Sequence, residues 1–291
     1  MSVSRTLRRS FCFVCLFCFT SRVPLLAAGE PVSPVLDSAL DRLYNFDFPG
    51  AHRILDEWQR THPQDPVGFA LQGAAYMFGE FARLQILDGE FFEDDKQIAS
   101  KKKLKYDAKV RDEFYAQVNH AQALAQQQLL KNPDDQNALF AETMSNGMLT
   151  DYVSLVEKRG LASLSYAKEG QVYALRLLKI NPTFYDAYLT TGFTEYLVGS
   201  LPFFVKWFVH FDDTQGSKQA AIQNLEKVAQ DGYYLKPFSK ILLAIIYLRA
   251  DQPARSEQLL NQLVAEFPEN PLLRKEQTRV RGLVQTQTVK S

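Results

Sequence analysis

The stretch Asp41–Pro66 reads DRLYNFDFPGAHRILDEWQRTHPQDP and decides the fold class. Within it a small residue, Ala51, is followed by an apolar residue four positions later, Leu55, and by another three positions after that, Trp58. This spacing puts the three side chains on one face of a helix. Pro63 follows five positions on and ends the helix, because proline cannot continue its hydrogen bonding. The stretch therefore predicts the second helix of a helix–turn–helix unit.

The same pattern of a small residue followed by two apolar or long side chains returns along the chain. Its copies are Ala121-Ala125-Gln128 before Pro133, Gly170-Ala174-Leu177 before Pro182, Ala221-Leu225-Val228 before Asp231-Gly232, and Ser256-Leu260-Leu263 before Pro268. Self-similarity of this kind indicates a helical repeat, in which each unit buries its apolar face against the next. The sequence therefore predicts an all-α protein of roughly twelve helices in antiparallel pairs.

The repeated pattern resembles the tetratricopeptide repeat (TPR) family, whose unit pairs two antiparallel helices. The best matching stretches are Asp41–Pro66, Asn119–Phe140, Lys168–Gly192 and Leu243–Pro271. The stretch Tyr185–Arg249 also resembles exported bacterial proteins of this type and, distantly, the eukaryotic inclusion-body-clearance branch. The resemblance implies an α-solenoid or a compact helical-repeat domain that binds other molecules.

The spacing of the units favours the compact alternative. The closing prolines at positions 63, 133, 182 and 268 are 70, 49 and 86 residues apart, which are not multiples of about 34. Gly68–Leu130 is expected to form two extended helices, joined by a charged turn between Glu90 and Lys105. The polar segment 277–291 is expected to be a frayed C-terminal tail, so that the repeat domain covers residues 30–276.

The N-terminal segment, residues 1–29, has the composition of a secretory signal peptide. Arg5, Arg8 and Arg9 precede an apolar run from Phe11 to Phe19, and small residues follow around Ala28. The apolar run is shorter than the roughly 20 residues that a membrane-spanning helix needs. We therefore expect an exported protein of the periplasm or cell envelope, cleaved near Ala28 or Gly29. The Arg8-Arg9 pair leaves the twin-arginine route open beside the general one.

The same segment contains all three cysteines, so the mature chain is expected to have neither a disulfide nor a reactive thiol. The chain has 33 basic and 33 acidic residues, and removal of the leader leaves 29 basic against 33 acidic ones. Nucleic-acid-binding proteins show a basic excess instead. We therefore expect no nucleic-acid partner.

The sequence contains no recognisable catalytic constellation. Its four histidines, at positions 52, 62, 120 and 210, lie near no nucleophile or carboxylate pair at a familiar spacing. His210, Asp212 and Asp213 have the chemistry of metal ligands. Asp212-Asp213-Thr214 reads better, however, as the capped start of a helix. The sequence predicts no enzyme activity, no metal site and no cofactor.

Residues 196–211 are almost entirely apolar and aromatic, with Lys206 as the one charged side chain. Three interpretations stay open: a buried core helix, a groove for an apolar ligand or peptide, and an element in contact with a membrane surface. Candidate binding residues here are Tyr196, Phe203, Phe204, Trp207 and Phe208.

Two further groups of side chains are candidates for binding. Tyr185 and Tyr188 lie near a turn between repeats, where amphipathic rings often serve recognition. Lys101, Lys102 and Lys103 form a basic cluster suited to an acidic partner or an anionic lipid surface. A solvated turn, neutralised by the acidic residues from Glu90 to Asp95 before it, is the favoured explanation of these lysines.

The first functional hypothesis is therefore a non-catalytic module that binds another protein or a peptide and scaffolds a complex. The alternative is a binding component for an apolar small molecule or a lipid, associated with a transporter. The two differ in a checkable way, because a ligand-binding protein needs an enclosed apolar cavity, whereas a scaffold needs an open groove with polar and aromatic side chains. The sequence does not decide between them.

Overall fold

The computed structural model of the protein describes residues 33–89, 104–200 and 217–290, and the side chains of these residues except for those of 197–200 and 288–290. In these ranges all regular secondary structure is helical, which confirms the predicted fold class. The helices are α1 (Pro34–Tyr44), α2 (Phe48–Thr61), α3 (Pro66–Arg83), α6 (Ala108–Lys131), α7 (Gln136–Asp151), the π-helical turn η1 (Tyr152–Val156), α8 (Gly160–Ile180), α9 (Ala187–Ser200), α11 (Lys218–Asp231), α12 (Lys236–Arg249), α13 (Pro253–Glu266) and α14 (Pro271–Lys290).

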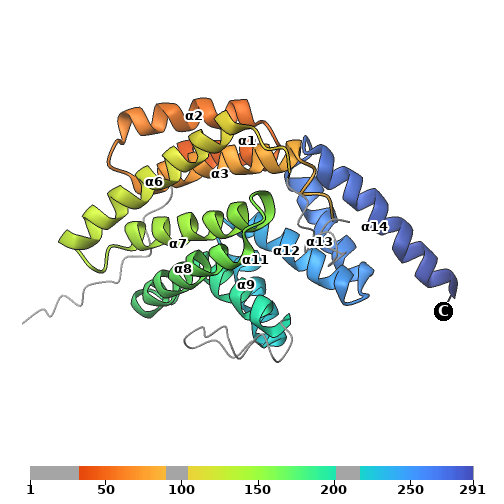
Figure 1. Cartoon of the computed structure of the whole chain (residues 1–291). Helices are drawn as coiled ribbons and strands as arrows, with labels where there is room; N and C mark the ends of the chain where they lie inside the picture. Colours follow the sequence, from red (N-terminus) through yellow and green to blue (C-terminus); the bar gives the residue numbers. More distant parts are fainter. Residues whose placement is uncertain (1–32, 90–103, 201–216, 291) are drawn as a thin grey trace, which may run out of the picture. The chain divides into compact units, whose positions relative to one another are not determined.

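Consecutive helices pack against one another as antiparallel pairs (Figure 1). The pairs are α1–α2, α3–α6, α7–α8, α9–α11 and α12–α13, and α14 packs on α13. The first helices of neighbouring pairs also touch, since α3 contacts α7 and α7 contacts α9. Two rows of helices result, and the row of first helices faces inward.

The buried face of each second helix is the one that the small-residue pattern predicts. The leading small residues Ala51, Ala121, Gly170, Ala221 and Ser256 are all buried. At Gly170 the space is tight, because a Cβ atom there would lie 3.2 Å from the Cβ of Asn146 in α7. The small side chains thus allow the two helices of a pair to approach closely.

Polar residues in the turns fix where the helices begin. The side chains of Asp65, Asp107, Asp135 and Ser217 accept hydrogen bonds from backbone amides in the first turns of α3, α6, α7 and α11. Such caps satisfy amides that have no partner within the helix. The stop prolines and the caps lie in the turns, and together they determine where each helix ends and where its antiparallel partner begins.

Two predicted boundaries can be compared with the structure. α3 ends at Arg83 and α6 begins at Ala108, so the two helices expected between Gly68 and Leu130 exist but are separated by a longer connection than the predicted turn. The prediction of a frayed tail from residue 277 is wrong as far as Lys290, because α14 continues to that residue. Val280 in this helix is fully buried.

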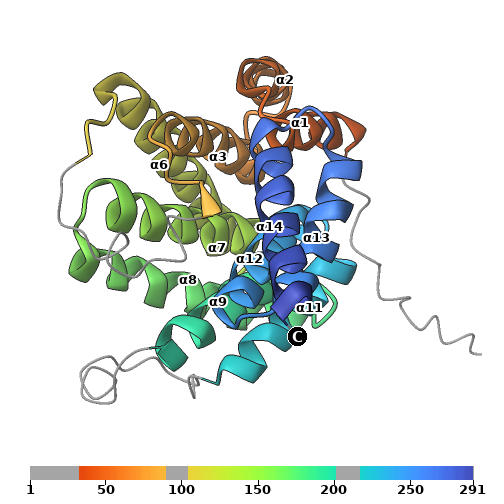
Figure 2. The same cartoon turned by 90° about the vertical axis from the view of Figure 1, so that its right-hand side faces the viewer.

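The first helix also contacts segments much later in the chain. The hydroxyl of Tyr44 in α1 donates a hydrogen bond of 2.9 Å to the carbonyl oxygen of Tyr234, in the turn before α12. Its ring packs against Phe267 at the end of α13, with 5.2 Å between the ring centroids. Within residues 33–290, these contacts close the row of first helices. Figure 2 shows α1 beside the α13–α14 pair.

In the described ranges, no helix combines the length and the apolar composition that a membrane crossing requires.

Candidate functional site

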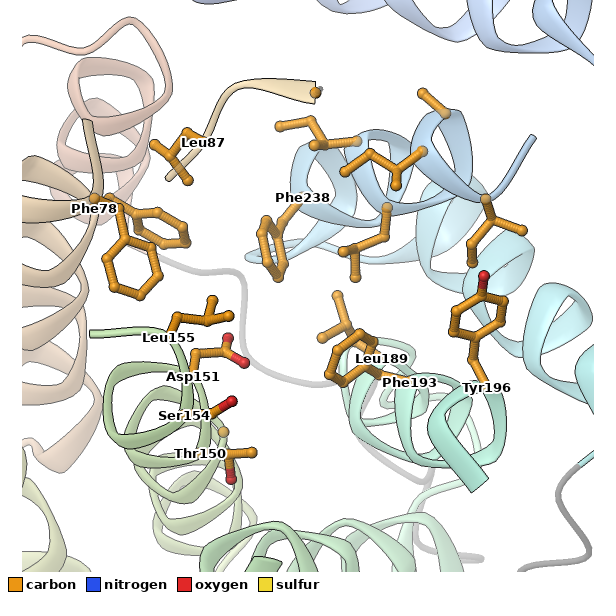
Figure 3. Close-up of a pocket in the computed structure, with 18 of the residues that line it drawn as sticks. Phe78, Leu87, Thr150, Asp151, Ser154, Leu155, Leu189, Phe193, Tyr196 and Phe238 are labelled. Carbon is orange, nitrogen blue, oxygen red and sulfur yellow. The ribbon is translucent and has the colours of Figure 1, made fainter. Parts of the chain in front are cut away.

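The inward-facing helices enclose a cavity of about 480 Å³. Its wall is formed mainly by aromatic and aliphatic side chains, among them Phe78, Leu87, Leu155, Leu189, Phe193 and Phe238 (Figure 3). These residues come from α3, the segment after it, η1, α9 and α12. A volume of this size lies within the range typical of small-molecule sites, which are mostly apolar with a few polar groups.

One side of the cavity is a continuous stripe on α7 and η1. Gly147, Thr150, Asp151, Ser154 and Leu155 line the cavity, at the i, i+3, i+4, i+7 and i+8 spacing of a helical face. The intervening residues Tyr152, Val153 and Val156 are buried in the protein core. At its C-terminal end, one side of this helix therefore meets the core and the other meets the cavity.

The stripe crosses a local change of helix type. Directly after Asp151 the chain makes a π-helical turn, in which the amide of Glu157 donates to the carbonyl oxygen of Tyr152 over 3.2 Å. Lys158 then adopts a left-handed conformation with φ of 57° and ends the element. Single π-helical turns are rare and occur frequently at functional sites. Here the turn lies where the polar part of the stripe, Asp151 and Ser154, faces the cavity.

Asp151 is the one acidic side chain of this stripe, and in Figure 3 its carboxyl group points into the cavity. Among the described residues no side chain or amide gives this carboxyl a hydrogen bond or an ion pair. Burial raises the pKa of Asp151 from its ordinary value to about 7, and no neighbouring charge contributes to the shift. An Asp that is buried without a partner is rare in proteins.

Two hydroxyl groups, those of Thr150 and Ser154, lie on the same stripe as Asp151. The hydroxyl of Thr150 donates to the carbonyl oxygen of Asn146 over 2.8 Å, so it offers the cavity only its lone pairs. Ser154 presents a second hydroxyl on the same stripe (Figure 3). The other ionisable residues that line the cavity are Tyr44, Tyr166, Tyr196, Arg249 and Glu276. Of these, Glu276 is paired with Arg279 at 2.7 Å.

Gly147 leaves part of the cavity open. A Cβ atom built on this residue would meet no other atom within 4 Å, although the helix around it is largely buried. A side chain at this position would therefore project into empty space. The glycine contributes directly to the cavity volume.

The predicted binding residues do not all lie in one place in the structure. Tyr196 lines the cavity. Tyr185 and Tyr188 do not line it, and they pack on the surface between α9 and α11, where Lys227 lies 4.3 Å from the Tyr188 ring centroid. The remaining candidates lie outside the described residues: Lys101, Lys102, Lys103, Phe203, Phe204, Trp207 and Phe208.

The same holds for the candidate metal ligands His210, Asp212 and Asp213. In the part of the chain that the structure describes, no group of three His, Cys, Asp or Glu residues is arranged to hold a metal ion. His52, His62 and His120 each pack against an aromatic ring, those of Tyr76, Trp58 and Phe69 respectively. These histidines therefore have packing partners.

Sequence reasoning missed Asp151. A signal was present, because Asp151 is the only charged residue between Met148 and Val156, in the run MLTDYVSLV. A single charge on a helix that is apolar on all sides indicates either an ion pair or a functional role. The choice between these needed the surroundings of the helix, which the sequence does not provide.

The chain has no significant match among protein-family models or among curated proteins. The geometry of the cavity is therefore the observation that bears on function.

Proposed function

We propose that this protein binds an apolar small molecule, or the apolar part of a lipid, in the cavity between its helices. The observation that carries the proposal is the apolar wall of this cavity of about 480 Å³, formed by side chains from most of the helices. Between the two hypotheses from the sequence, an apolar cavity between helices favours the ligand-binding one. In the described residues, the lining of this cavity is mainly apolar, whereas a scaffold would use a polar groove.

The size of the hydrophobic effect makes such binding strong enough to be useful. Each buried CH₂ group contributes about 0.8 kcal/mol. A ligand with about ten such groups would gain ~8 kcal/mol, from which the cost of immobilising it must be subtracted. The full ~8 kcal/mol would correspond to a dissociation constant of about 1 μM, so after this subtraction a ligand of this size binds more weakly than that and a larger apolar ligand is needed for micromolar affinity.

We propose binding without catalysis. Among the described lining residues, Asp151 is the unpaired acidic group of the cavity stripe, and no histidine lies beside it. General acid–base or nucleophilic catalysis would require a second group that exchanges protons with the first. The lining residues supply hydroxyl groups, the carboxyl group of Asp151 and the carboxylate of Glu276 that is paired with Arg279, and these groups suit recognition.

A second candidate function is a module that binds another protein, as the repeat resemblance implies. Two exposed apolar side chains on α8 favour it, since Leu161 is 88% and Val172 60% exposed. They lie eleven residues apart, about three helical turns, and so share one side of the helix. Crosslinking in intact cells tests this candidate, and a dominant protein partner attached near α8 would support it.

The location of this function is part of the proposal. The basic and apolar N-terminal segment supports export to the periplasm or the cell envelope. Mass spectrometry of the protein purified from its own cells would then find a mature chain that begins near Ala28 or Gly29. An intact Met1 start in the soluble fraction of the cytoplasm would contradict export.

Native mass spectrometry of the same material tests the ligand. A bound mass that survives gentle desolvation and is released by organic solvent is expected, and it would identify the ligand. The emptied protein should then bind an environment-sensitive apolar dye with one-to-one stoichiometry. A protein that carries no ligand and binds neither the dye nor alkyl compounds would overturn the proposal.

A further inference from the structure

We propose that the ligand of this cavity carries an ammonium group and that Asp151 is its counter-ion. The inference rests on the proposed function, because it specifies the headgroup of the molecule that the cavity binds. The supporting observations are the direction of the carboxyl group, its missing partner and the chemistry of the surrounding wall.

The polar corner of the cavity is built to accept hydrogen bonds. The Asp151 carboxyl group faces the cavity without a partner among the described residues. The Thr150 hydroxyl donates its hydrogen to the carbonyl oxygen of Asn146, so it can only accept a hydrogen bond from a ligand. A group with several N–H donors and a positive charge satisfies both features, whereas a carboxylate or a phosphate would be repelled.

The apolar wall does not oppose a cation. The rings of Phe78, Phe193 and Phe238 line the cavity around Asp151 (Figure 3). The faces of aromatic rings attract cations, and this attraction strengthens where water is excluded. An ammonium group paired with Asp151 would therefore lie among aromatic rings while its alkyl part contacts the aliphatic wall.

Among the described residues, no positively charged side chain occupies the position beside Asp151 that the cation of a ligand would take. Arg249 on α12 lines the same cavity but makes an interaction of its own, and Glu276 on α14 is paired with Arg279. α1, α8 and α9 contribute Tyr44, Tyr166 and Tyr196, and the lining residues of α3 carry no charge. Lys158 follows η1, and neither it nor Arg249 acts on the ionisation of Asp151.

The arrangement makes binding dependent on pH. The pKa of Asp151 lies at about 7 in the empty cavity, because burial disfavours the carboxylate. A primary ammonium group keeps its proton up to roughly pH 10. The ion pair therefore forms fully above pH 7, and affinity for an ammonium ligand should fall as the pH drops from 8 to 6. A neutral ligand should show no such change.

Three probes with the same alkyl chain test the inference: dodecylamine, dodecanol and dodecanoic acid. Each displaces the apolar dye from the purified full-length protein at pH 6 and pH 8. We expect dodecylamine to bind at least about tenfold more tightly than dodecanol at pH 8, and this preference to shrink at pH 6. In the Asp151→Asn variant the ratio of the two affinities should fall close to one. Asp134→Asn, an exposed acid in the α6–α7 turn, should leave the ratio unchanged.

The outcomes separate the inference from the proposed function. Equal binding of the amine and the alcohol at both pH values would overturn the ammonium headgroup while the cavity function stands. Tightest binding of dodecanoic acid at pH 6 would also overturn it, in favour of a neutral pair of carboxyl groups. If none of the three displaces the dye, both fail. Should Asp151→Asn not fold, the pH profile of the wild-type protein still decides.

Discussion

The side-chain amide of Asn270 donates a hydrogen bond of 2.7 Å to the backbone carbonyl oxygen of Tyr44, across 226 positions of the chain. The other side-chain atom of Asn270, Oδ1, accepts from the amides of Leu272 and Leu273 and caps α14. One residue thus starts the last helix and ties it to the end of the first. Both Asn270 and Tyr44 line the cavity, so this contact also forms part of its wall.

Asn270→Ser separates the two roles of this residue. Serine keeps an oxygen for the cap but cannot reach Tyr44, which leaves a buried carbonyl oxygen unpaired. We expect the free energy of unfolding to fall by about 1–3 kcal/mol, and by about 1 kcal/mol more in Asn270→Ala, which also loses the cap. Urea unfolding followed by circular dichroism measures both.

Asn261 offers a matched control for these variants. Its hydrogen bond with Gln277 is exposed to solvent. Asn261→Ala should therefore change stability by less than about 0.5 kcal/mol. Equal losses in the variants of Asn261 and Asn270 would refute the structural role of the long-range contact.

Filling the cavity from Gly147 should abolish ligand binding without unfolding the protein. A Cβ atom here meets no other atom within 4 Å, so the side chain of Gly147→Leu would extend into the cavity rather than into the core. Helix propensity improves at the same time by roughly 0.5–1 kcal/mol. We expect dye affinity to drop at least about tenfold while thermal stability is kept or raised.

Gly282→Leu is the control for this experiment. Gly282 is also a helical glycine with open space around it, but it lies on α14 and does not line the cavity. This variant should bind the dye like the wild-type protein. Loss of binding in both variants would show that the dye reports a surface effect.

The helical repeat was readable from the sequence because its signal is local. The small residues that begin each copy, such as Ala51 and Ala221, define a buried face within a single helix. The prediction at residue 277 was wrong because the last helix is polar in composition, which by itself indicates a frayed tail. The helix is fixed instead by contacts with distant residues: Val280 lies in the core, and Lys275 and Arg281 form ion pairs with Asp88 and Glu257.

The cavity was not readable, because it depends on how helices of different repeats are placed. Phe78 and Phe238 are 160 positions apart in the sequence, yet their rings meet edge to face with centroids 5.5 Å apart. Periodicity predicts only that each ring faces inward. Whether inward-facing side chains fill the space or leave a cavity depends on their summed volumes, and Gly147 illustrates how one missing side chain changes that sum.

Stability should depend on pH through Asp151. Its pKa in the folded protein, about 7, lies above the value of roughly 4 expected in the unfolded chain. Between pH 4 and pH 7 the folded protein therefore holds a proton that the unfolded chain has released. This group makes no contribution below pH 4; its cost to folding grows between pH 4 and pH 7 and stays constant above pH 7. Burial raises the pKa of Glu142 and Asp186 as well, which acts in the same direction.

Asp151→Asn isolates this contribution. The variant should be more stable than the wild-type protein at pH 8 by roughly 1–3 kcal/mol and nearly equal to it at pH 4, because the cost of the buried carboxyl group builds up only above the pKa of the unfolded chain. Guanidinium unfolding at the two pH values gives the comparison. A variant that is less stable at pH 8 would mean that the carboxylate has a stabilising partner, which would argue against an empty counter-ion position.

Two glycines of α3 should respond oppositely to the same substitution. A Cβ atom on Gly68 would lie 2.8 Å from Nε1 of Trp58. That ring cannot move aside, because its Nε1 donates to Asp65 over 2.6 Å and its face stacks on His62. A Cβ atom on Gly79 would lie 3.6 Å from the Phe48 ring, an ordinary contact.

We therefore expect Gly68→Ala to lower the free energy of unfolding by about 1–3 kcal/mol, the usual cost of overpacking. Gly79→Ala should raise it by roughly 0.5–1 kcal/mol through helix propensity. Trp58 fluorescence during denaturation follows both variants and reports the disturbed ring directly in the first. If Gly68→Ala were as stable as Gly79→Ala, the Trp58–Asp65 hydrogen bond would not be holding the ring. The α2–α3 turn would then be set by its cap alone, with Asp65 binding the amides of Val67 and Gly68.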